Sequence, residues 1–317
     1  MLKQRNLLRE TTLNQRDLSR KAMLNQRDLS WKTMLKNKKN FPKKTLQIKK
    51  KGASMSSILT TIADYTHFRI AEKKMKKPLP ELKKEAEALP PLTGFPFEKA
   101  LRQKDINFIC ECKKASPSKG VIAEDFPYLD IAREYEAAGA ACISVLTEPK
   151  WFLGSDRYLA EISRAVSIPC LRKDFTIDEY MIYEARVLGA SCVLLICSLL
   201  SEETLHRYLQ LCNELGLSAL VEAHSEEEIA DALRAGARMI GVNNRNLADF
   251  TVDIHNSERL RRLVPPEVLF VAESGIKTAE DIQVLREAKV NGVLIGETLM
   301  RSFDKRAMLD TLMGEGQ

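Results

Sequence analysis

Short apolar runs recur eight times in the second two thirds of the chain, each flanked by polar segments. The runs are rich in Val, Ile and Leu and show no alternation of apolar and polar positions. A half-exposed strand alternates, whereas a strand buried on both faces of a parallel sheet does not. The pattern therefore predicts eight buried parallel strands: Ile106–Lys113, Ala141–Leu146, Pro169–Lys173, Cys192–Ile196, Ser218–Glu222, Met239–Val242, Val268–Ala272 and Gly292–Ile295.

Segments with the spacing of helices lie between these runs. Thr278 and Ser225 each precede an acidic first turn, and Gly189 and Gly216 follow predicted helix ends, as do other glycines. These start and stop signals agree with the periodicity. The predicted helices are Leu129–Ala138, Asp156–Ala165, Asp178–Leu188, Glu202–Leu215, Ser225–Ala235, Ser257–Leu263, Ala279–Ala288 and Arg306–Met313.

Eight strand-helix units in this part of the chain predict the α/β class and, within it, a closed (β/α)8 TIM barrel, typically about 250 residues with additions. A doubly wound sheet is the rival, but it has fewer units and a glycine-rich first turn. Here the first strand ends in Glu111-Cys112-Lys113 instead. Before the barrel, we expect an extra helix over Ser57–Lys76, a stretch broken by prolines, and a short helix over Phe97–Gln103.

The first 44 residues are an eleven-residue repeat, clearest in Leu13–Ser19 and Leu24–Ser30. Residues 1–54 hold 16 basic and 3 acidic residues, so the net charge of +6 hides a mildly acidic remainder. We therefore expect a basic tail over 1–54 and a catalytic barrel over 55–317. Three interpretations of the tail stay open: a disordered extension, an arm that binds nucleic acid or anionic lipid, and upstream sequence with translation starting at Met55. Nucleic-acid binding is the weaker of the first two, because only Trp31 and Phe41 offer surface for base stacking.

The remaining composition indicates a cytoplasmic protein. No apolar run approaches the ~18 residues of a membrane span, and the basic N-terminus lacks the apolar stretch of a secretory signal. The chain has seven cysteines, most of them in or beside predicted strands and none in a C-x-x-C pair. They are expected to be buried, reduced thiols.

Charged residues follow several predicted strands, where a barrel collects its catalytic groups. A charge that ends a buried strand is costly unless it is paired or used. Amines in a partly closed pocket can have a depressed pKa and donate protons near neutrality, and neighbouring glutamates can relay them. The predicted catalytic residues are Glu111, Lys113, Lys173, Glu222 and Asn243. For His224, a catalytic role and a helix-capping role both stay open, and four histidines without ligand spacing predict no metal.

The last two strands end in glycines, in Ser274-Gly275 and Gly296-Glu297. Exposed backbone N–H groups at these ends of a barrel commonly bind a phosphate. We therefore predict that Gly275, Gly296 and Glu297 bind phosphate and that Arg245 adds a bidentate contact.

Several of these segments together resemble the indole-3-glycerol phosphate synthase family of tryptophan biosynthesis. The resemblance covers the chain from about Met55 to its end, and the repeat tail has no counterpart in it. It is carried by Glu111–Gly120 (ECKKASPSKG), Leu146–Ser155 (LTEPKWFLGS), Leu171–Phe175 (LRKDF), Gly241–Leu247 (GVNNRNL) and Val271–Ile276 (VAESGI).

The resemblance implies a decarboxylating ring closure of 1-(2-carboxyphenylamino)-1-deoxyribulose 5-phosphate, without cofactor or metal. It implies that Lys173 protonates the sugar carbonyl and that Lys113 offsets the substrate carboxylate. It leaves open which of Glu111 and Glu222 removes protons. Further substrate contacts are expected from Ser116, Phe152, Phe175, Leu194, Arg245, Glu273 and Ser274. The expected partner is this phosphosugar, with no membrane contact, and contact with other enzymes of the pathway is left open. Another phosphosugar barrel and a binding protein that acts through its tail are the rival functions.

Overall fold

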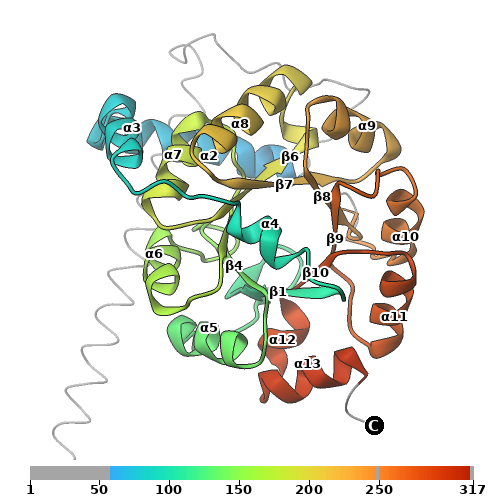
Figure 1. The fold of residues 1–317 in the computed structure, drawn as a ribbon. Coiled ribbons are helices and arrows are strands. Elements are labelled where there is room, and N and C mark those ends of the chain that lie inside the picture. The colour runs from blue at the N-terminus through green and yellow to red at the C-terminus, as the bar shows by residue number, and fades with distance from the viewer. Residues whose placement is uncertain (1–57, 247–249, 315–317) are drawn as a thin grey trace, which may run out of the picture. The chain divides into compact units, whose positions relative to one another are not determined.

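The structure, a computed structural model, describes residues 58–246 and 250–314 (Figure 1). The basic tail expected over 1–54 lies outside the described residues, and so does Ser57, the first residue of the predicted extra helix.

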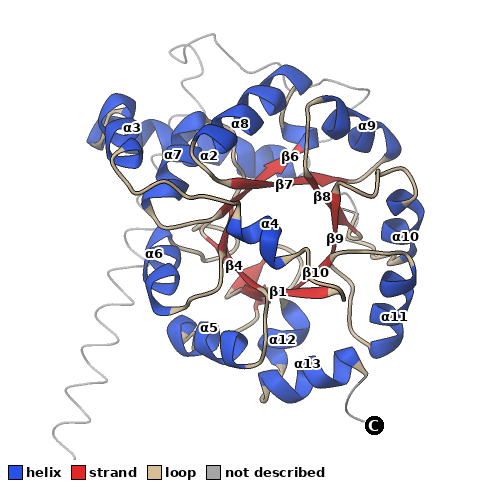
Figure 2. Ribbon diagram, viewed as in Figure 1, coloured by secondary structure: helices blue, strands red, loops and turns tan. Residues whose placement is uncertain are grey.

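Eight parallel strands close into a barrel, as the apolar runs predict (Figure 2). Around the barrel the order is β1-β10-β9-β8-β7-β6-β5-β4, and β4 pairs with β1 to complete the ring. Nearly every strand residue is buried, which explains why the runs lack alternation. The strands are β1 (Asn107–Cys112), β4 (Cys142–Leu146), β5 (Cys170–Lys173), β6 (Cys192–Ile196), β7 (Ser218–Ala223), β8 (Met239–Asn243), β9 (Leu269–Glu273) and β10 (Gly292–Ile295).

Helices lie outside the strands and follow the predicted segments closely, several of them with the expected side-chain caps (Figure 2). Ser155, Asp178, Ser201 and Ser225 each accept a hydrogen bond from the first turn of a helix, and Thr278 forms a full capping box with Asp281. These helices are α5 (Tyr128–Ala137), α6 (Asp156–Ala165), α7 (Glu179–Val187), α8 (Glu202–Glu214), α9 (Glu226–Arg234), α10 (His255–Arg261), α11 (Ala279–Glu287) and α13 (Lys305–Met313).

Four small elements were not predicted. A two-stranded hairpin, β2 (Ala115–Ser116) with β3 (Gly120–Val121), follows β1, and a short helix, α12 (Glu297–Arg301), follows β10. A turn of 3-10 helix, η2 (Cys197–Leu199), follows β6. All four lie in connections that leave the carboxyl ends of strands.

The segment before the barrel forms three helices, α2 (Ile58–Lys76), α3 (Leu79–Glu87) and α4 (Pro96–Ala100). The prediction of a stretch broken by prolines is wrong for α3. Pro78 caps this helix and a proline lies in its first turn, where the missing N–H costs no hydrogen bond. Helix α4 is shorter than predicted. Its Phe97 and the adjacent Leu101 are fully buried, and Leu101 lies against Gly292 at the amino end of β10.

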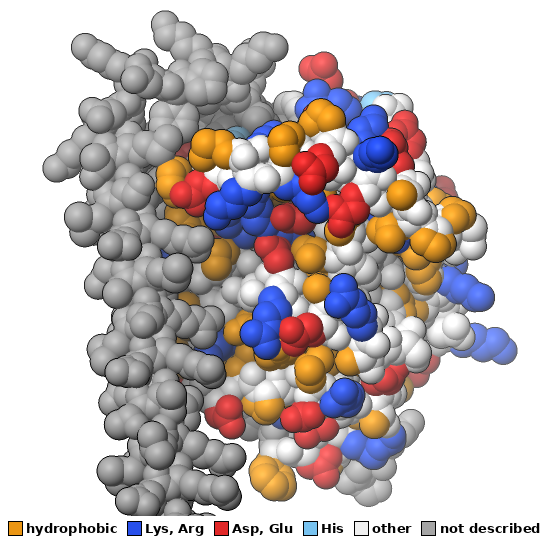
Figure 3. All heavy atoms as spheres, turned by 90° about the vertical axis from the view of Figure 1, so that its left-hand side faces the viewer, with side chains coloured by type: hydrophobic (Ala, Val, Ile, Leu, Met, Phe, Trp, Pro, Cys, Tyr) orange, Lys and Arg blue, Asp and Glu red, His pale blue; other side chains and the backbone are white. Residues whose placement is uncertain are grey.

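The surface and the thiols agree with the composition. On the face drawn in Figure 3, acidic and basic side chains of the described residues are interspersed. All seven cysteines are buried and free, as predicted. Among the described residues, no helix combines the length and the apolar character that crossing a membrane requires.

Candidate active site at the carboxyl ends of the strands

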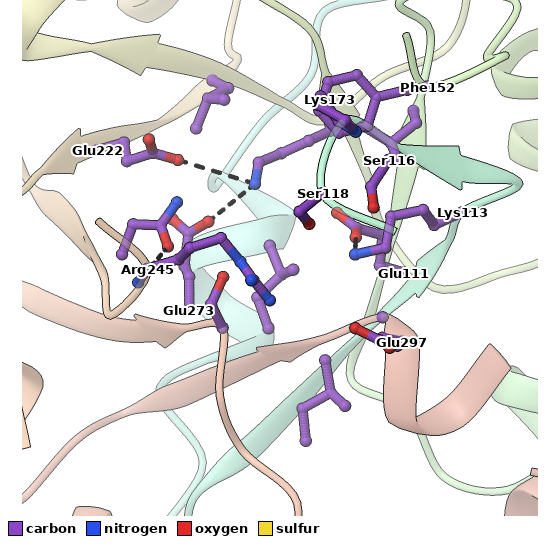
Figure 4. A pocket seen from close by; sticks show the side chains of 18 of the residues that line it. Glu111, Lys113, Ser116, Ser118, Phe152, Lys173, Glu222, Arg245, Glu273 and Glu297 are labelled. Carbon is purple, nitrogen blue, oxygen red and sulfur yellow. Dashed lines mark hydrogen bonds and ion pairs between the residues drawn. The ribbon is translucent and has the colours of Figure 1, made fainter. Parts of the chain in front are cut away.

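Every site residue predicted from the sequence lines one cavity at the carboxyl ends of the strands (Figure 4). The residues come from six of the eight strands and from the loops that follow them. The structure thus brings together side chains that are almost 190 residues apart in sequence. Which role each of them has is treated below as a proposal.

The first charged group of the cavity is an ion pair on β1. Lys113 Nζ lies 2.8 Å from Glu111 Oε1, and Ser144 Oγ on β4 donates to Glu111 Oε2 at 3.3 Å. Burial opposes the charge of Glu111, but the nearby ammonium groups of Lys113 and Lys173 outweigh it, so the pKa of Glu111 is lowered. A Cβ on Gly296 would lie 2.5 Å from Glu111 Oε1 and 2.8 Å from Lys113 Nζ, so a side chain there would displace this ion pair.

The second group is centred on Lys173 at the end of β5. Its Nζ donates to Glu273 Oε2 at 2.8 Å and lies 3.9 Å from Glu222 Oε2 (Figure 4). Burial alone would lower the pKa of Lys173, but Glu273, Glu111 and Glu222 together raise it. The expectation of a depressed amine pKa is therefore wrong for Lys173, which keeps its proton at neutral pH.

Glu273 has a different electrostatic environment. The pKa of Glu273 is raised to about 7, mainly by burial. The Lys173 ammonium group acts against this increase, and the Glu222 carboxylate adds to it. The second oxygen of Glu273, Oε1, is buried without a hydrogen-bond partner among the described residues. Gly241 on β8 leaves room for this oxygen, because a Cβ there would lie 2.3 Å from it. The Glu273 side chain is therefore held between Lys173 and Gly241, with one oxygen paired and the other buried.

Asn243 is the last residue of β8, and Arg245 lies two residues beyond it. The backbone N–H of Arg245 donates to Asn243 Oδ1 at 3.0 Å, which fixes the amide of Asn243. Among the described residues, the Arg245 guanidinium donates one hydrogen bond, to the Phe250 carbonyl at 3.4 Å, and it extends along the cavity (Figure 4).

The loops after β9 and β10 form a glycine-bearing corner of the cavity. Ser274 and Gly275 both have positive φ angles, 67° and 85°, and Gly296 precedes α12. A non-glycine residue in this backbone region is strained and is typical of functional sites. Ser118 also lines the cavity; it was not predicted as a site residue, although it lies in the Glu111–Gly120 segment.

An apolar wall faces the charged groups. Phe152 and Phe175 have ring centroids 6.0 Å apart, and Leu194 of β6 lies on the same cavity. The first turns of α2 complete the wall with Ile58, Leu59 and Ile62. The sequence predicted this helix but did not assign these three residues to the site; their apolar spacing at the start of the helix was the available signal.

The Phe152 loop is held by a buried carboxylate that the sequence did not single out. Glu148 accepts backbone N–H groups of Lys150, Trp151 and Phe152 at 2.7–3.0 Å. Gly154 allows the loop to close on itself, because a Cβ there would lie 2.3 Å from the Leu146 carbonyl oxygen. The loop conformation therefore fixes the position of the Phe152 ring.

Ser225, not His224, caps α9, and a catalytic role of His224 stays a prediction. Its backbone N–H donates to Glu228 Oε2 at 2.8 Å in the first turn of α9, while its Nε2 lies 3.5 Å from Glu222 Oε1. Burial alone would lower the pKa of His224, but Glu228, Glu222 and Glu273 together raise it. The imidazole is thus next to the cavity and connects Glu222 with the helix behind it.

Comparison with known proteins agrees with this geometry. Residues 59–312 match the family model described as indole-3-glycerol phosphate synthase. Among curated proteins, the chain is 57% identical over 257 residues to the indole-3-glycerol phosphate synthase of Ruminiclostridium cellulolyticum, covering 81% of this chain and 99% of that protein. It is 53% identical over 266 residues to that of Lachnoclostridium phytofermentans, covering 80% and 98%.

Solved structures of low sequence identity share the fold. A 3-hexulose-6-phosphate synthase superposes with a TM-score of 0.52 at 14% identity, covering 66% of this chain and 99% of that one. KGPDC from Streptococcus mutans gives a TM-score of 0.52 at 12% identity, covering 67% and 97%. The fold comes from these structures and the family from the sequence matches: the chain belongs to the indole-3-glycerol phosphate synthase family.

Proposed function

We propose that the protein converts 1-(2-carboxyphenylamino)-1-deoxyribulose 5-phosphate into indole-3-glycerol phosphate, carbon dioxide and water. The observation that carries the proposal is the composition of one cavity. Two lysine–carboxylate pairs, Lys113 with Glu111 and Lys173 with Glu273, lie between an apolar wall and a glycine-bearing corner. The substrate has an aromatic ring, a sugar chain and a phosphate, and the cavity offers a matching surface for each.

In this reaction the ring carbon that bears the carboxylate attacks the sugar carbonyl. A weak carbon nucleophile needs a proton donor on the carbonyl oxygen as the bond forms. Lys173 suits this role, because its neighbouring carboxylates raise its pKa and keep the ammonium group protonated. The carbonyl becomes a hydroxyl, carbon dioxide leaves from the ring carbon that formed the new bond, and the hydroxyl is later lost as water.

The other polar residues supply charge and proton transfer. Lys113 offsets the substrate carboxylate until it leaves as carbon dioxide. Glu111 and Glu222 remove protons and orient the amine and the hydroxyls, and Asn243 holds a sugar hydroxyl. Proton transfer and electrostatic placement can lower this barrier without a metal or an organic cofactor.

The two ends of the substrate bind to different walls. The anthranilate ring packs against Phe152, Phe175 and Leu194. The phosphate binds backbone N–H groups of Gly275, Gly296 and Glu297 at the opposite corner, with the Arg245 guanidinium beside it. Ser116, Glu273 and Ser274 contact the sugar between these two ends.

We further propose that the protein acts in the cytoplasm, which seven buried and unbridged cysteines support. Contact with other enzymes of tryptophan biosynthesis is the remaining partner proposal. The basic tail is not part of the proposed catalytic function.

A direct assay tests the function. Purified protein is incubated with the carboxyphenylamino sugar phosphate, and indole fluorescence is followed over time. We expect fluorescence to appear at a rate proportional to protein concentration, and no increase would reject the proposal. Protein that lacks residues 1–54 should keep its turnover, whereas a protein that acts through the basic tail would lose its activity. Intact-mass measurement of the native protein tests separately whether the repeat is translated.

A further inference from the structure

Lys173 is flanked in sequence by two buried charged residues that the reaction itself does not use. Successive side chains of an extended chain point to opposite faces. Lys173 points into the cavity. Arg172 binds groups on α6 and α7, and Asp174, which also borders the cavity, binds Arg69 of α2. Both Arg172 and Asp174 have fully buried side chains.

Asp174 is held from several sides. Arg69 of α2 binds it with two hydrogen bonds, Nη2 to Oδ1 at 2.7 Å and Nη1 to Oδ2 at 3.0 Å. Thr147 Oγ1 donates to Oδ2 at 2.6 Å, and the backbone N–H of Phe175 donates to Oδ1 at 2.8 Å. The carboxylate therefore connects α2 and the loop after β4 with the two cavity residues on either side of it, Lys173 and Phe175.

Arg172 fixes the other side of Lys173. Its guanidinium donates to Asp156 Oδ1 and Glu184 Oε2, both at 2.7 Å, and to the Met181 carbonyl at 2.9 Å. Its Nε donates to the same Thr147 hydroxyl at 3.2 Å. Arg172 is thus anchored on α6 and α7. Two residues of α2 reach this network: Arg69 through Asp174, and Lys73, which pairs with Asp156 and lies 2.6 Å from Glu184 Oε1.

The same helix forms part of the cavity wall. Ile58, Leu59 and Ile62 of α2 line the cavity, two turns before Arg69. Further along, Tyr65 packs edge-on against Trp151 with ring centroids 5.4 Å apart, next to Phe152. Arg69 thus connects α2, which forms part of the cavity wall, with the backbone next to Lys173, the proposed proton donor.

We infer that Arg69 is a positioning residue. Through its bidentate contact with Asp174, it links the position of α2 at the cavity mouth to the orientation of the Lys173 side chain. The inference rests on the proposed role of Lys173 as proton donor. A bidentate guanidinium–carboxylate pair fixes direction as well as distance, and here it lies one residue from the reacting amine. Loss of this pair frees the end of β5 to move, while Glu273 and Glu222 stay in place on their own strands.

An ion pair between α2 and the barrel that lies outside this network provides a matched control. Lys74 Nζ lies 2.7 Å from Asp178 Oδ2 at the start of α7, more exposed and without contact to Lys173. Arg69→Ala and Lys74→Ala each remove one link between α2 and the barrel, but only Arg69→Ala releases Asp174. Arg69→Lys keeps the charge and loses the paired geometry, so it serves if Arg69→Ala does not fold.

The test measures kcat and KM of these three variants with the proposed substrate, together with thermal unfolding. We expect Arg69→Ala to lower kcat by about 10²-fold, as a displacement of about 1 Å does at a reacting group. Arg69→Lys should show a smaller loss, and Lys74→Ala should keep the wild-type kcat. Guanidinium ion at low millimolar concentration should restore part of the kcat of Arg69→Ala only.

Three results would overturn the inference. They are a wild-type kcat in both Arg69 variants, a rise in KM alone, and an equal loss of kcat in Lys74→Ala. A rise in KM alone would mean that Arg69 only holds the wall of the cavity. Absence of turnover in the wild type is a separate outcome, which rejects the proposed function.

Discussion

Lys173 and Glu273 reach across the barrel mouth from β5 and β9 and meet at 2.8 Å. Three strands separate β5 from β9 on one side of the ring, so this contact exists only because the barrel is closed. It keeps an ammonium group protonated next to a carboxyl whose pKa burial raises to about 7. A protonated amine and a carboxyl with a pKa near neutrality are thus held side by side.

Removing the Lys173 amine is expected to lower kcat by about 10²- to 10⁴-fold, the usual contribution of a positioned acid. Lys173→Met keeps most of the aliphatic stem and is the gentler variant, while Lys173→Ala removes it. Circular dichroism should show a folded barrel in Lys173→Met. Turnover like that of the wild type in either folded variant would remove Lys173 as the acid.

Glu273 is expected to make the protein less stable as the pH rises from about 4.5 to about 7. In this window the folded state keeps a proton on Glu273 that the unfolded chain has lost, because burial raises the pKa of the carboxyl. This contribution is complete below the unfolded pKa and disappears as the pH passes the folded one. It amounts to roughly 1 kcal/mol per pH unit.

The pH effect is measured by urea unfolding of the wild type and of Glu273→Gln across this window. The slope of the unfolding free energy against pH should be smaller in the variant. Glu287→Gln, on the exposed surface of α11, is the control and should keep the wild-type slope. Parallel profiles for the wild type and Glu273→Gln would contradict the assignment.

Gly241→Ala is expected to displace Glu273. The added Cβ would lie 2.3 Å from Glu273 Oε1 and 3.1 Å from Leu220 Cδ1. Overpacking of this kind in a core costs about 1–3 kcal/mol, and activity should fall with it. Shortening the carboxylate in Gly241→Ala/Glu273→Asp should recover part of the lost stability. Strictly additive effects in this double-mutant cycle would mean that the two residues are not coupled.

Gly275→Asp is expected to weaken substrate binding through the phosphate. The new carboxylate would repel the phosphate, and the φ of 85° at this position disfavours any side chain. KM should rise at least about tenfold, equivalent to roughly 1.4 kcal/mol. Gly236→Asp has similar backbone strain, with a φ of 91°, but lies between α9 and β8 at the opposite end of the barrel. A normal KM in Gly275→Asp, or an equal rise in both variants, would reject the phosphate site.

The apolar pattern was sufficient to predict the strands, because a strand that is buried on both faces is apolar at nearly every position. The runs at Cys192–Ile196 and Gly292–Ile295 have the predicted bounds, and the other six differ by one or two residues at their ends. Helix α3 was missed because its prolines look like breakers in sequence, although Pro78 and Pro80 sit at the helix start, where no donor is required.

The sequence by itself determined the closed barrel, the family and the group of side chains at the strand ends, because a charged residue or a glycine lies at the end of most of the strands. Only the tertiary structure decided which side chains pair. Glu273, rather than Glu222, is the close partner of Lys173, the amine pKa is raised rather than depressed, and Asp174 binds Arg69 more than a hundred residues away. Such pairings depend on how the sheet closes and on where α2 lies. The spacing of residues along the chain does not determine the distances across a barrel.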